Sequence, residues 1–133
     1  MTIYALSSGP GISGIAVIRV SGNKSKEIIS SITTGKFPEE RVATLKKIIN
    51  PKSGELIDEG MIIWFKAPNS YTGEDMLELQ VHGSKAVVEE IQNTLGKFDE
   101  CRLAEPGEFT KLAFQNGKIN LLKAESIADL VSS

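Results

Sequence analysis

Residues 76–82, Met-Leu-Glu-Leu-Gln-Val-His, alternate between apolar and polar side chains, and this alternation predicts a β-strand. Because successive side chains of a strand point to opposite faces, Leu77, Leu79 and Val81 are expected on one face of a sheet. The other side chains of the strand are expected on the opposite face: Met76, Glu78, Gln80 and His82. The strand therefore separates an apolar face from a largely polar one.

Further elements are predicted on both sides of this strand. Short apolar or β-branched runs predict strands at residues 3–6, 15–20, 41–49, 56–65 and 101–104. Apolar residues at helical spacing predict helices at about residues 23–32, 85–95, 108–116 and 120–133. The expected N-terminal caps are Asn23, Ser84 and Asn120, and Gly117 is expected to end the third helix. The last helix has no stop signal, so we expect the natural chain to continue beyond it.

The connections favour an α+β fold. Residues 50–54, Asn-Pro-Lys-Ser-Gly, lie between two predicted strands and indicate a hairpin, which joins antiparallel neighbours. Strands and short helices interleave along the chain without the regular alternation of a doubly wound fold. We therefore expect a mixed or antiparallel sheet with flanking helices.

Composition narrows the class of protein. The chain has 133 residues, 41% of them hydrophobic and 24% charged, as in a single globular domain. Its net charge of −2 lacks the basic excess that a nucleic-acid-binding domain normally carries. Cys101 and His82 are the single cysteine and histidine, so neither an internal disulfide nor a Cys/His metal cage is expected. A reducing, cytoplasmic compartment fits this cysteine usage, and no apolar run approaches the length of a membrane span.

Arg19 and Glu78 are charged residues with apolar neighbours on both sides in predicted strands. Arg19 interrupts the apolar run of residues 15–20, and Glu78 lies between two leucines. A charge in a strand is costly unless it is solvated or paired. Arg19 therefore lies either on a solvated face or against an anionic ligand or a partner subunit. Glu78 lies either on an exposed face or in a site where its carboxylate accepts two N–H groups from a planar ring.

Other polar residues carry weaker signals. Residues 9–14, Gly-Pro-Gly-Ile-Ser-Gly, lack the Gly-Lys-Ser/Thr ending of a phosphate-binding loop and lead into a strand, so a tight connection is expected. His82 has no evident nucleophile partner, which argues against a catalytic triad. Glu108 in a first helical turn and Lys118 after a helix end are each explained by the helix dipole.

Three long blocks of the chain form a specific pattern. The blocks are GPGISGIAVIRVSG (9–22), PNSYTGEDMLELQVHG (68–83) and AEPGEFTKLAFQNGKINL (104–121), followed by AESIADL (124–130). Together they resemble the tRNA modification GTPase family called MnmE or TrmE. They occur in order from one end of the chain to the other, whereas residues 23–60 carry little of the resemblance.

The resemblance implies a function and a set of partners. Members of the family bind a 5-formyltetrahydrofolate-type one-carbon donor through an N-terminal domain that resembles tetrahydrofolate-binding aminomethyltransferases. They form homodimers and act with the FAD protein MnmG (GidA) on C5 of the wobble uridine of certain tRNAs. The full-length proteins also bind GTP, Mg²⁺ and K⁺ through a GTPase domain. By this resemblance, residues 1–118 are the N-terminal folate-binding and dimerisation domain, and residues 119–133 begin a helical domain.

The resemblance also assigns a site. The family's folate-contacting residues fall on Arg19, Glu78 and Lys118, with Glu78 expected to accept donors from the pterin edge and the two cations expected to face polar or carboxylate groups of the ligand. Two positions depart from the family pattern: Ile12-Ser13, where a basic residue and more glycine are frequent, and Leu112, where an arginine is common. Folate affinity or a surface contact could differ accordingly.

Three other functions are alternatives to a folate-binding module. The 133 residues contain neither the GTP-binding motifs nor the C-terminal cysteine motif of the family, so this chain alone is not expected to hydrolyse GTP or to complete tRNA modification. A free-standing folate-dependent one-carbon transferase would need a base or nucleophile with partners. A dimerisation scaffold without a ligand would be insensitive to a change at Glu78. A direct nucleic-acid-binding domain is disfavoured by the net charge.

Overall fold

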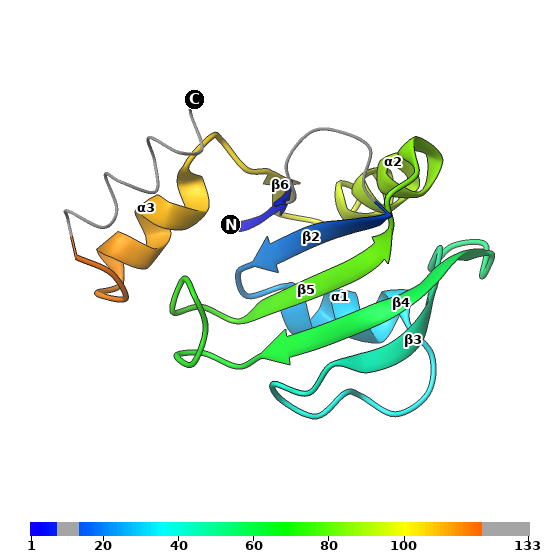
Figure 1. Cartoon of the computed structure of the whole chain (residues 1–133), viewed down its shortest axis with the longest axis horizontal. Helices are drawn as coiled ribbons and strands as arrows, with labels where there is room; N and C mark the ends of the chain where they lie inside the picture. The colour runs from blue at the N-terminus through cyan, green and yellow to red at the C-terminus, as the bar shows by residue number, and fades with distance from the viewer. Residues whose placement is uncertain (8–13, 121–133) are drawn as a thin grey trace.

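A six-stranded sheet forms the centre of the fold, in the order β3-β4-β5-β2-β1-β6 (Figure 1). The computed structural model describes residues 1–7 and 14–120. The strands are β1 (Thr2–Leu6), β2 (Ile15–Ser21), β3 (Thr44–Ile49), β4 (Leu56–Phe65), β5 (Met76–His82) and β6 (Cys101–Leu103). The helices are α1 (Ser25–Ile32), α2 (Lys85–Leu95) and α3 (Glu108–Gln115).

The strand pairing is mostly antiparallel. The pairs β1/β2, β2/β5, β4/β5 and β3/β4 are antiparallel, and β3/β4 is the hairpin predicted around residues 50–54. Only the pairing of β1 with the short edge strand β6 is parallel among the described strands. The expected α+β architecture, a mixed sheet with flanking helices, is therefore confirmed.

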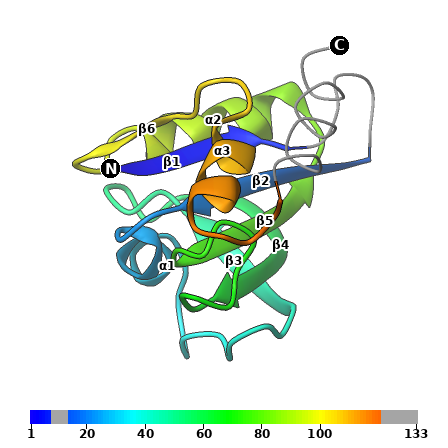
Figure 2. The same ribbon diagram turned by 90° about the vertical axis from the view of Figure 1, so that its left-hand side faces the viewer.

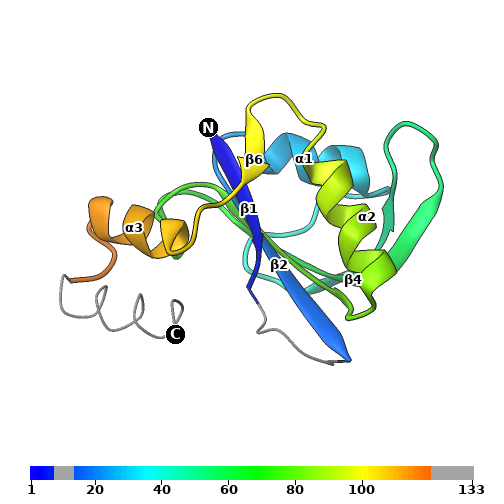
Figure 3. The same ribbon diagram turned by 90° about the horizontal axis from the view of Figure 1, so that it is seen from above.

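One face of the sheet is covered by α1 and α2. Figure 3 shows both helices on the same side of the strands, with α1 packed on β5 and α2 packed on β1, β4 and β5. The apolar side of β5 lies beneath them, since Leu77 and Leu79 are fully buried and Val81 is nearly so. The apolar face of α1 that the helical spacing predicted is buried there as well: Ile28, Ile29 and Ile32.

The third helix lies apart from this core. Figure 2 views the molecule from the end of the sheet where β2 finishes and β5 begins, and α3 is nearest to the viewer. The helix ends as predicted: Gly117 has a φ of 71°, its N–H donates to the carbonyl of Phe114, and the N–H of Lys118 donates to the carbonyl of Ala113. The predicted helix at 120–133 and most of the 9–14 connection lie outside the described residues.

The start of α1 differs from the sequence prediction. We expected Asn23 to cap this helix, but the capping position is Lys24 and no side chain of the helix's own segment caps it. Thr2 of β1 acts instead, because its Oγ1 accepts the N–H of Lys24 at 3.0 Å. The turn that brings Lys24 to β1 requires Gly22, whose φ is 138° and whose added Cβ would lie 2.5 Å from Thr2 Oγ1. In contrast, Ser84 caps α2 as predicted, with its Oγ accepting from Val87 N at 3.2 Å.

Gly60 provides a test of the close approach between β4 and β5. A Cβ at this position would collide with the main-chain carbonyl oxygen of Gln80 on the neighbouring strand. We expect Gly60→Ala to lower the free energy of unfolding by about 1–3 kcal/mol, as overpacking against an unyielding neighbour does. Gly14→Ala, where an added Cβ meets nothing within 4 Å, is the control in urea denaturation. Equal stability of the two variants would contradict the steric argument.

Candidate functional site

Arg19 and Glu78 form an ion pair with each other. In the β2/β5 ladder Arg19 is directly opposite Glu78, and Arg19 Nε donates to Glu78 Oε1 at 3.2 Å. Their side chains are 41% and 17% exposed and project from the face that α1 and α2 leave uncovered, because their neighbours Ile18 and Leu79 point into the core. The sequence suggested a ligand or a solvated face for each residue separately, and it did not indicate that they pair.

Glu78 has a second neighbour on its own strand. Gln80 Nε2 donates to Glu78 Oε2 at 3.2 Å, so both carboxylate oxygens accept a hydrogen bond. An ionised carboxylate has about four acceptor sites, which leaves capacity for a ligand that brings N–H groups. The pair with Arg19 explains how a carboxylate can occupy a central strand with so little exposure.

The loop between β4 and β5, residues 66–75, is anchored at the edge of this site. The Oγ of Ser21, at the end of β2, contacts Thr72 Oγ1 at 2.7 Å and donates to Glu74 Oε1 at 2.8 Å. Within the loop, Ser70 Oγ donates to the carbonyl of Glu74. These contacts hold the loop against the sheet beside Arg19 and Glu78.

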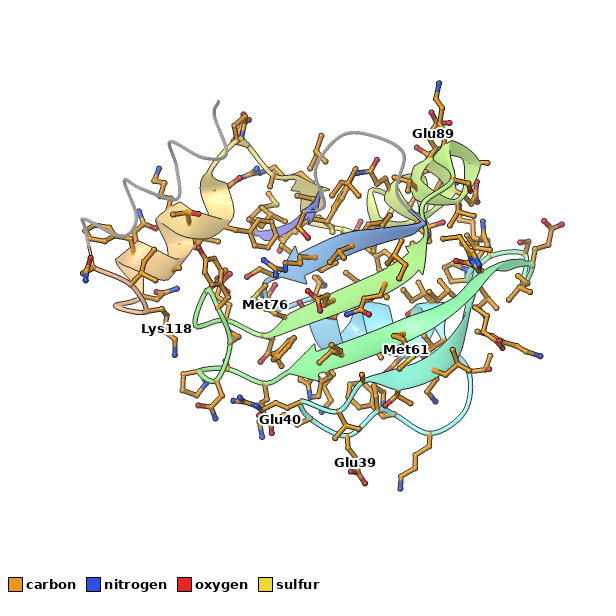
Figure 4. The ribbon with its side chains drawn as sticks, in the orientation of Figure 1. Glu39, Glu40, Met61, Met76, Glu89 and Lys118 are labelled. Atoms are coloured by element: carbon orange, nitrogen blue, oxygen red, sulfur yellow. The ribbon has the colours of Figure 1, made fainter. Side chains whose placement is uncertain are left out.

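The C-terminal end of α3 docks on the same loop. Asn116 Nδ2 donates to the carbonyl of Thr72 at 2.7 Å, and Lys118 Nζ donates to the carbonyl of Pro68 at 3.0 Å. Figure 4 shows Lys118 beside this loop, at the same end of the sheet as Met76. The structure thus brings Arg19 and Glu78 into contact, whereas the ammonium of Lys118 binds the loop.

In the described part of the chain, Arg19 lines two hollows, and Glu78 lines the smaller of them. A cleft of about 430 Å³ is walled by the C-terminal end of β1, by Arg19 and Tyr71, and by residues 103–110, which lead into α3. A smaller hollow of about 110 Å³ is lined by Arg19, Phe65, Tyr71, Met76 and Glu78. The larger cleft falls in the range of about 300–1,000 Å³ typical of small-molecule sites.

A second ion pair shapes the wall of the large cleft. Arg102 of β6 donates to both carboxylate oxygens of Glu108, with Nη1–Oε1 at 2.8 Å and Nη2–Oε2 at 2.6 Å. Glu108 Oε1 also accepts the N–H of Glu105 at 2.8 Å, which closes the turn before α3. Hydrogen bonding from Arg102 lowers the pKa of Glu108 below its ordinary value and outweighs the opposing effect of burial. The helix dipole alone had explained Glu108 in the sequence, and Arg102 was missed.

Asp58, His82 and Cys101 line neither hollow. The ring atom Nδ1 of His82 contacts Asp58 Oδ1 at 2.7 Å. The main-chain N–H of His82 donates to Asp58 Oδ2 at 2.8 Å. Burial raises the pKa of Asp58, but its hydrogen bonds from His82 prevail and lower it. Burial raises the pKa of the Cys101 thiol to about 11, so it stays protonated near neutral pH. No group of three or more potential metal ligands occurs in residues 1–7 and 14–120.

The chain is similar over nearly its whole length to proteins of one known family. The family model described as the GTP-binding protein TrmE N-terminus matches residues 2–118. The chain belongs to the TrmE N-terminal family. It is 65% identical over all 133 residues to the tRNA modification GTPase MnmE of Pelagibacter ubique, and 47% identical over 99% of its length to the protein of that name from Zymomonas mobilis.

The similarity extends to a mitochondrial protein. The chain is 45% identical, over 99% of its length, to the mitochondrial tRNA modification GTPase gtpbp3 of Dictyostelium discoideum. It spans 30% of the length of the two bacterial relatives and 27% of the Dictyostelium protein. The family match over residues 2–118 covers the first two sequence blocks and residues 104–118 of the third. None of the helices in the described residues is long and apolar enough to cross a membrane.

The Arg102–Glu108 pair predicts a pH dependence of stability. Because the folded pKa of Glu108 is lowered, its contribution to stability is complete above its unfolded pKa of about 4.3 and is lost as the pH falls through the folded value. We expect Glu108→Gln to be less stable than the parent at pH 7, with a difference that shrinks below about pH 4. Glu89→Gln, which removes only an exposed pair with Lys85 at 3.9 Å, is the control in thermal unfolding from pH 3 to 7. A difference independent of pH would refute this account.

Proposed function

We propose that this chain is the N-terminal module of a tRNA-modifying GTPase and that it binds a 5-formyltetrahydrofolate-type one-carbon donor. The observation that carries the proposal is the Arg19–Glu78 pair, in which Arg19 lines a 430 Å³ cleft and Glu78 an adjoining hollow, in a chain of the TrmE N-terminal family. The mixed sheet with its flanking helices is compatible with the proposed likeness to tetrahydrofolate-binding aminomethyltransferases.

The chemistry of the site suits such a ligand. The pterin ring presents adjacent N–H groups along one edge, and a carboxylate accepts such a pair with charge-assisted hydrogen bonds. Glu78 retains acceptor capacity for them, and Arg19 is exposed enough to face polar or carboxylate groups of the ligand. Lys118 reaches Pro68 through one hydrogen bond, and an ammonium has three donors, so it can also face an anionic group at that edge.

The wider assignment concerns the longer protein. We place the N-terminal domain at residues 1–118 and the start of a helical domain at 119–133, in keeping with the family match over residues 2–118. The relatives' names support GTP hydrolysis and tRNA modification by the whole protein. For that protein we propose GTP, Mg²⁺ and K⁺ as ligands, MnmG (GidA) with its FAD as partner, the wobble uridine as target and a cytoplasmic location.

Calorimetric titration with 5-formyltetrahydrofolate tests the ligand and the site together. We expect saturable binding by the parent chain. Glu78→Ala should weaken this binding by about 1.5–3 kcal/mol, because a hydrogen bond to a charged group contributes on that scale. Arg19→Met, which keeps an apolar stem of similar length, should weaken binding as well.

The control removes a carboxylate that lines neither hollow. Glu89 lies on the outer side of α2, away from the end of the sheet that holds Lys118 and Met76 (Figure 4). Glu89→Ala should leave the affinity unchanged. Absence of binding by the well-folded parent would leave the scaffold hypothesis in first place, and equal loss in both Glu→Ala variants would refute the site.

Homodimer formation is the second part of the proposal. In the described residues, the sheet face opposite α1 and α2 carries apolar side chains from four strands, including Ile15 at 57% and Leu45 at 60% exposure, with Met61 and Ile63 half-buried between them. The last five residues of β4, 61–65, are apolar on both faces of the sheet, which suggests that a second layer covers this side. A second copy of the chain is the occupant that we propose.

Sedimentation velocity tests this interface. Leu45→Lys should shift the chain from dimer toward monomer, because it places a charge in the middle of an apolar contact. The matched control is Leu56→Lys, which is equally exposed at 60% but lines a groove on the α2 side. Dissociation by both variants alike, or by neither, would place the interface elsewhere.

A further inference from the structure

Tyr71 lies between the two hollows of the candidate site. Among the residues that the structure describes, Arg19 and Tyr71 line both the 430 Å³ cleft and the 110 Å³ hollow. We propose that the ring of Tyr71 is a partition that divides one binding site into two compartments and thereby determines which ligands fit. The identity of the ligand rests on the proposed function, whereas the partition itself is a property of the fold.

The position of Tyr71 is set by contacts on both sides. Its hydroxyl lies 3.2 Å from the hydroxyl of Thr110, which is buried on α3 and lines the large cleft. The next residue, Thr72, is fully buried and is held by Ser21 of the sheet and by the side chain of Asn116. The ring is therefore attached to α3 at its tip and to the sheet through its main chain, so its place does not depend on a ligand.

The two compartments differ in what they can accept. The large cleft is of ligand size, and much of its wall is the turn that the Arg102–Glu108 pair closes. The small hollow is below the usual size of a complete site, and it combines the apolar walls of Phe65 and Met76 with the carboxylate of Glu78. This division fits a ligand with a larger body joined to a narrow, planar, polar edge that donates hydrogen bonds.

The partition has a second consequence, which needs no ligand. Tyr71, Phe65 and Met76 line the small hollow together with the Arg19–Glu78 pair, and the Glu78 side chain is 17% exposed. An ion pair is stronger where water is kept away from it. Removing the ring should therefore let water reach the pair and weaken the coupling between Arg19 and Glu78.

The first arm of the test measures this coupling in ligand-free protein. Arg19→Met, Glu78→Gln and the double variant are compared by urea unfolding in the parent and in a Tyr71→Ala background. We expect the coupling, expressed as a ratio of unfolding equilibrium constants, to fall by about threefold or more in the Tyr71→Ala background. Phe114→Ala, an aromatic deletion on α3 that lines neither hollow, should leave it unchanged. An unchanged coupling in the Tyr71→Ala background would overturn the partition.

The second arm measures selectivity. The affinities for 5-formyltetrahydrofolate and for 5-formyltetrahydropterin, which lacks the larger body of the ligand, are measured in the parent, Tyr71→Phe and Tyr71→Ala. The preference is the ratio of these two affinities. Tyr71→Phe should keep the parent's preference within about twofold, whereas Tyr71→Ala should reduce it by about tenfold, the usual scale for a changed pocket wall. If Tyr71→Ala does not fold, Tyr71→Leu replaces it, since it fills space without a ring.

The two arms test the Tyr71 partition and the folate proposal separately. Reduced coupling together with reduced selectivity supports the partition and its role in ligand choice. Reduced coupling in the Tyr71→Ala background, together with a parent that binds neither compound, would refute the folate proposal while supporting the partition. An unchanged preference in a Tyr71→Ala variant that binds both compounds would overturn the specificity role of Tyr71.

Discussion

The antiparallel pairing of β2 with β5 is the interaction on which the rest of the structure depends. Its seven residue pairs place Ile18, Val20, Leu77 and Leu79 on one face, where all four are fully buried beneath the helices. The same register places Arg19 directly opposite Glu78 on the other face. Because side chains alternate along a strand, a shift by one residue would expose the core and bury the charges. Fold and site therefore depend on one register.

The site is completed by elements that lie outside this ladder. The 66–75 loop and α3 hold each other through Asn116, Lys118 and the Tyr71–Thr110 contact. The Arg102–Glu108 pair fixes the turn that forms the far wall of the cleft. These polar contacts are partly exposed, so each contributes modestly to stability. Their main effect is geometric, because together they set the width of the cleft.

Sequence patterns predicted the helices and strands well. They were less successful for the side-chain contacts that cap helices and pair charges. The alternation in β5, the hairpin at residues 50–54 and the Ser84 cap were all confirmed. The Asn23 cap was wrong because the hydroxyl of Thr2, which is far away in the chain, takes that role. Arg102 was missed as the partner of Glu108 because a pairing across a turn has no periodic signature. Which residues contact folate remains a prediction.

Local chemistry along the chain was sufficient to establish the strands and helices, the two-sided character of β5 and, through three sequence blocks, the family. The strands, the helices and the two faces of β5 depend on neighbours within about ten residues, whose spacing is readable directly, whereas the family follows from the residue identities in the blocks. Only the tertiary structure decided that Arg19 meets Glu78, 59 residues away, that Lys118 reaches Pro68, 50 residues away, and that Tyr71 stands between two hollows. Such contacts follow from strand register and helix docking, which are set by the summed packing of the whole core and leave no local signal.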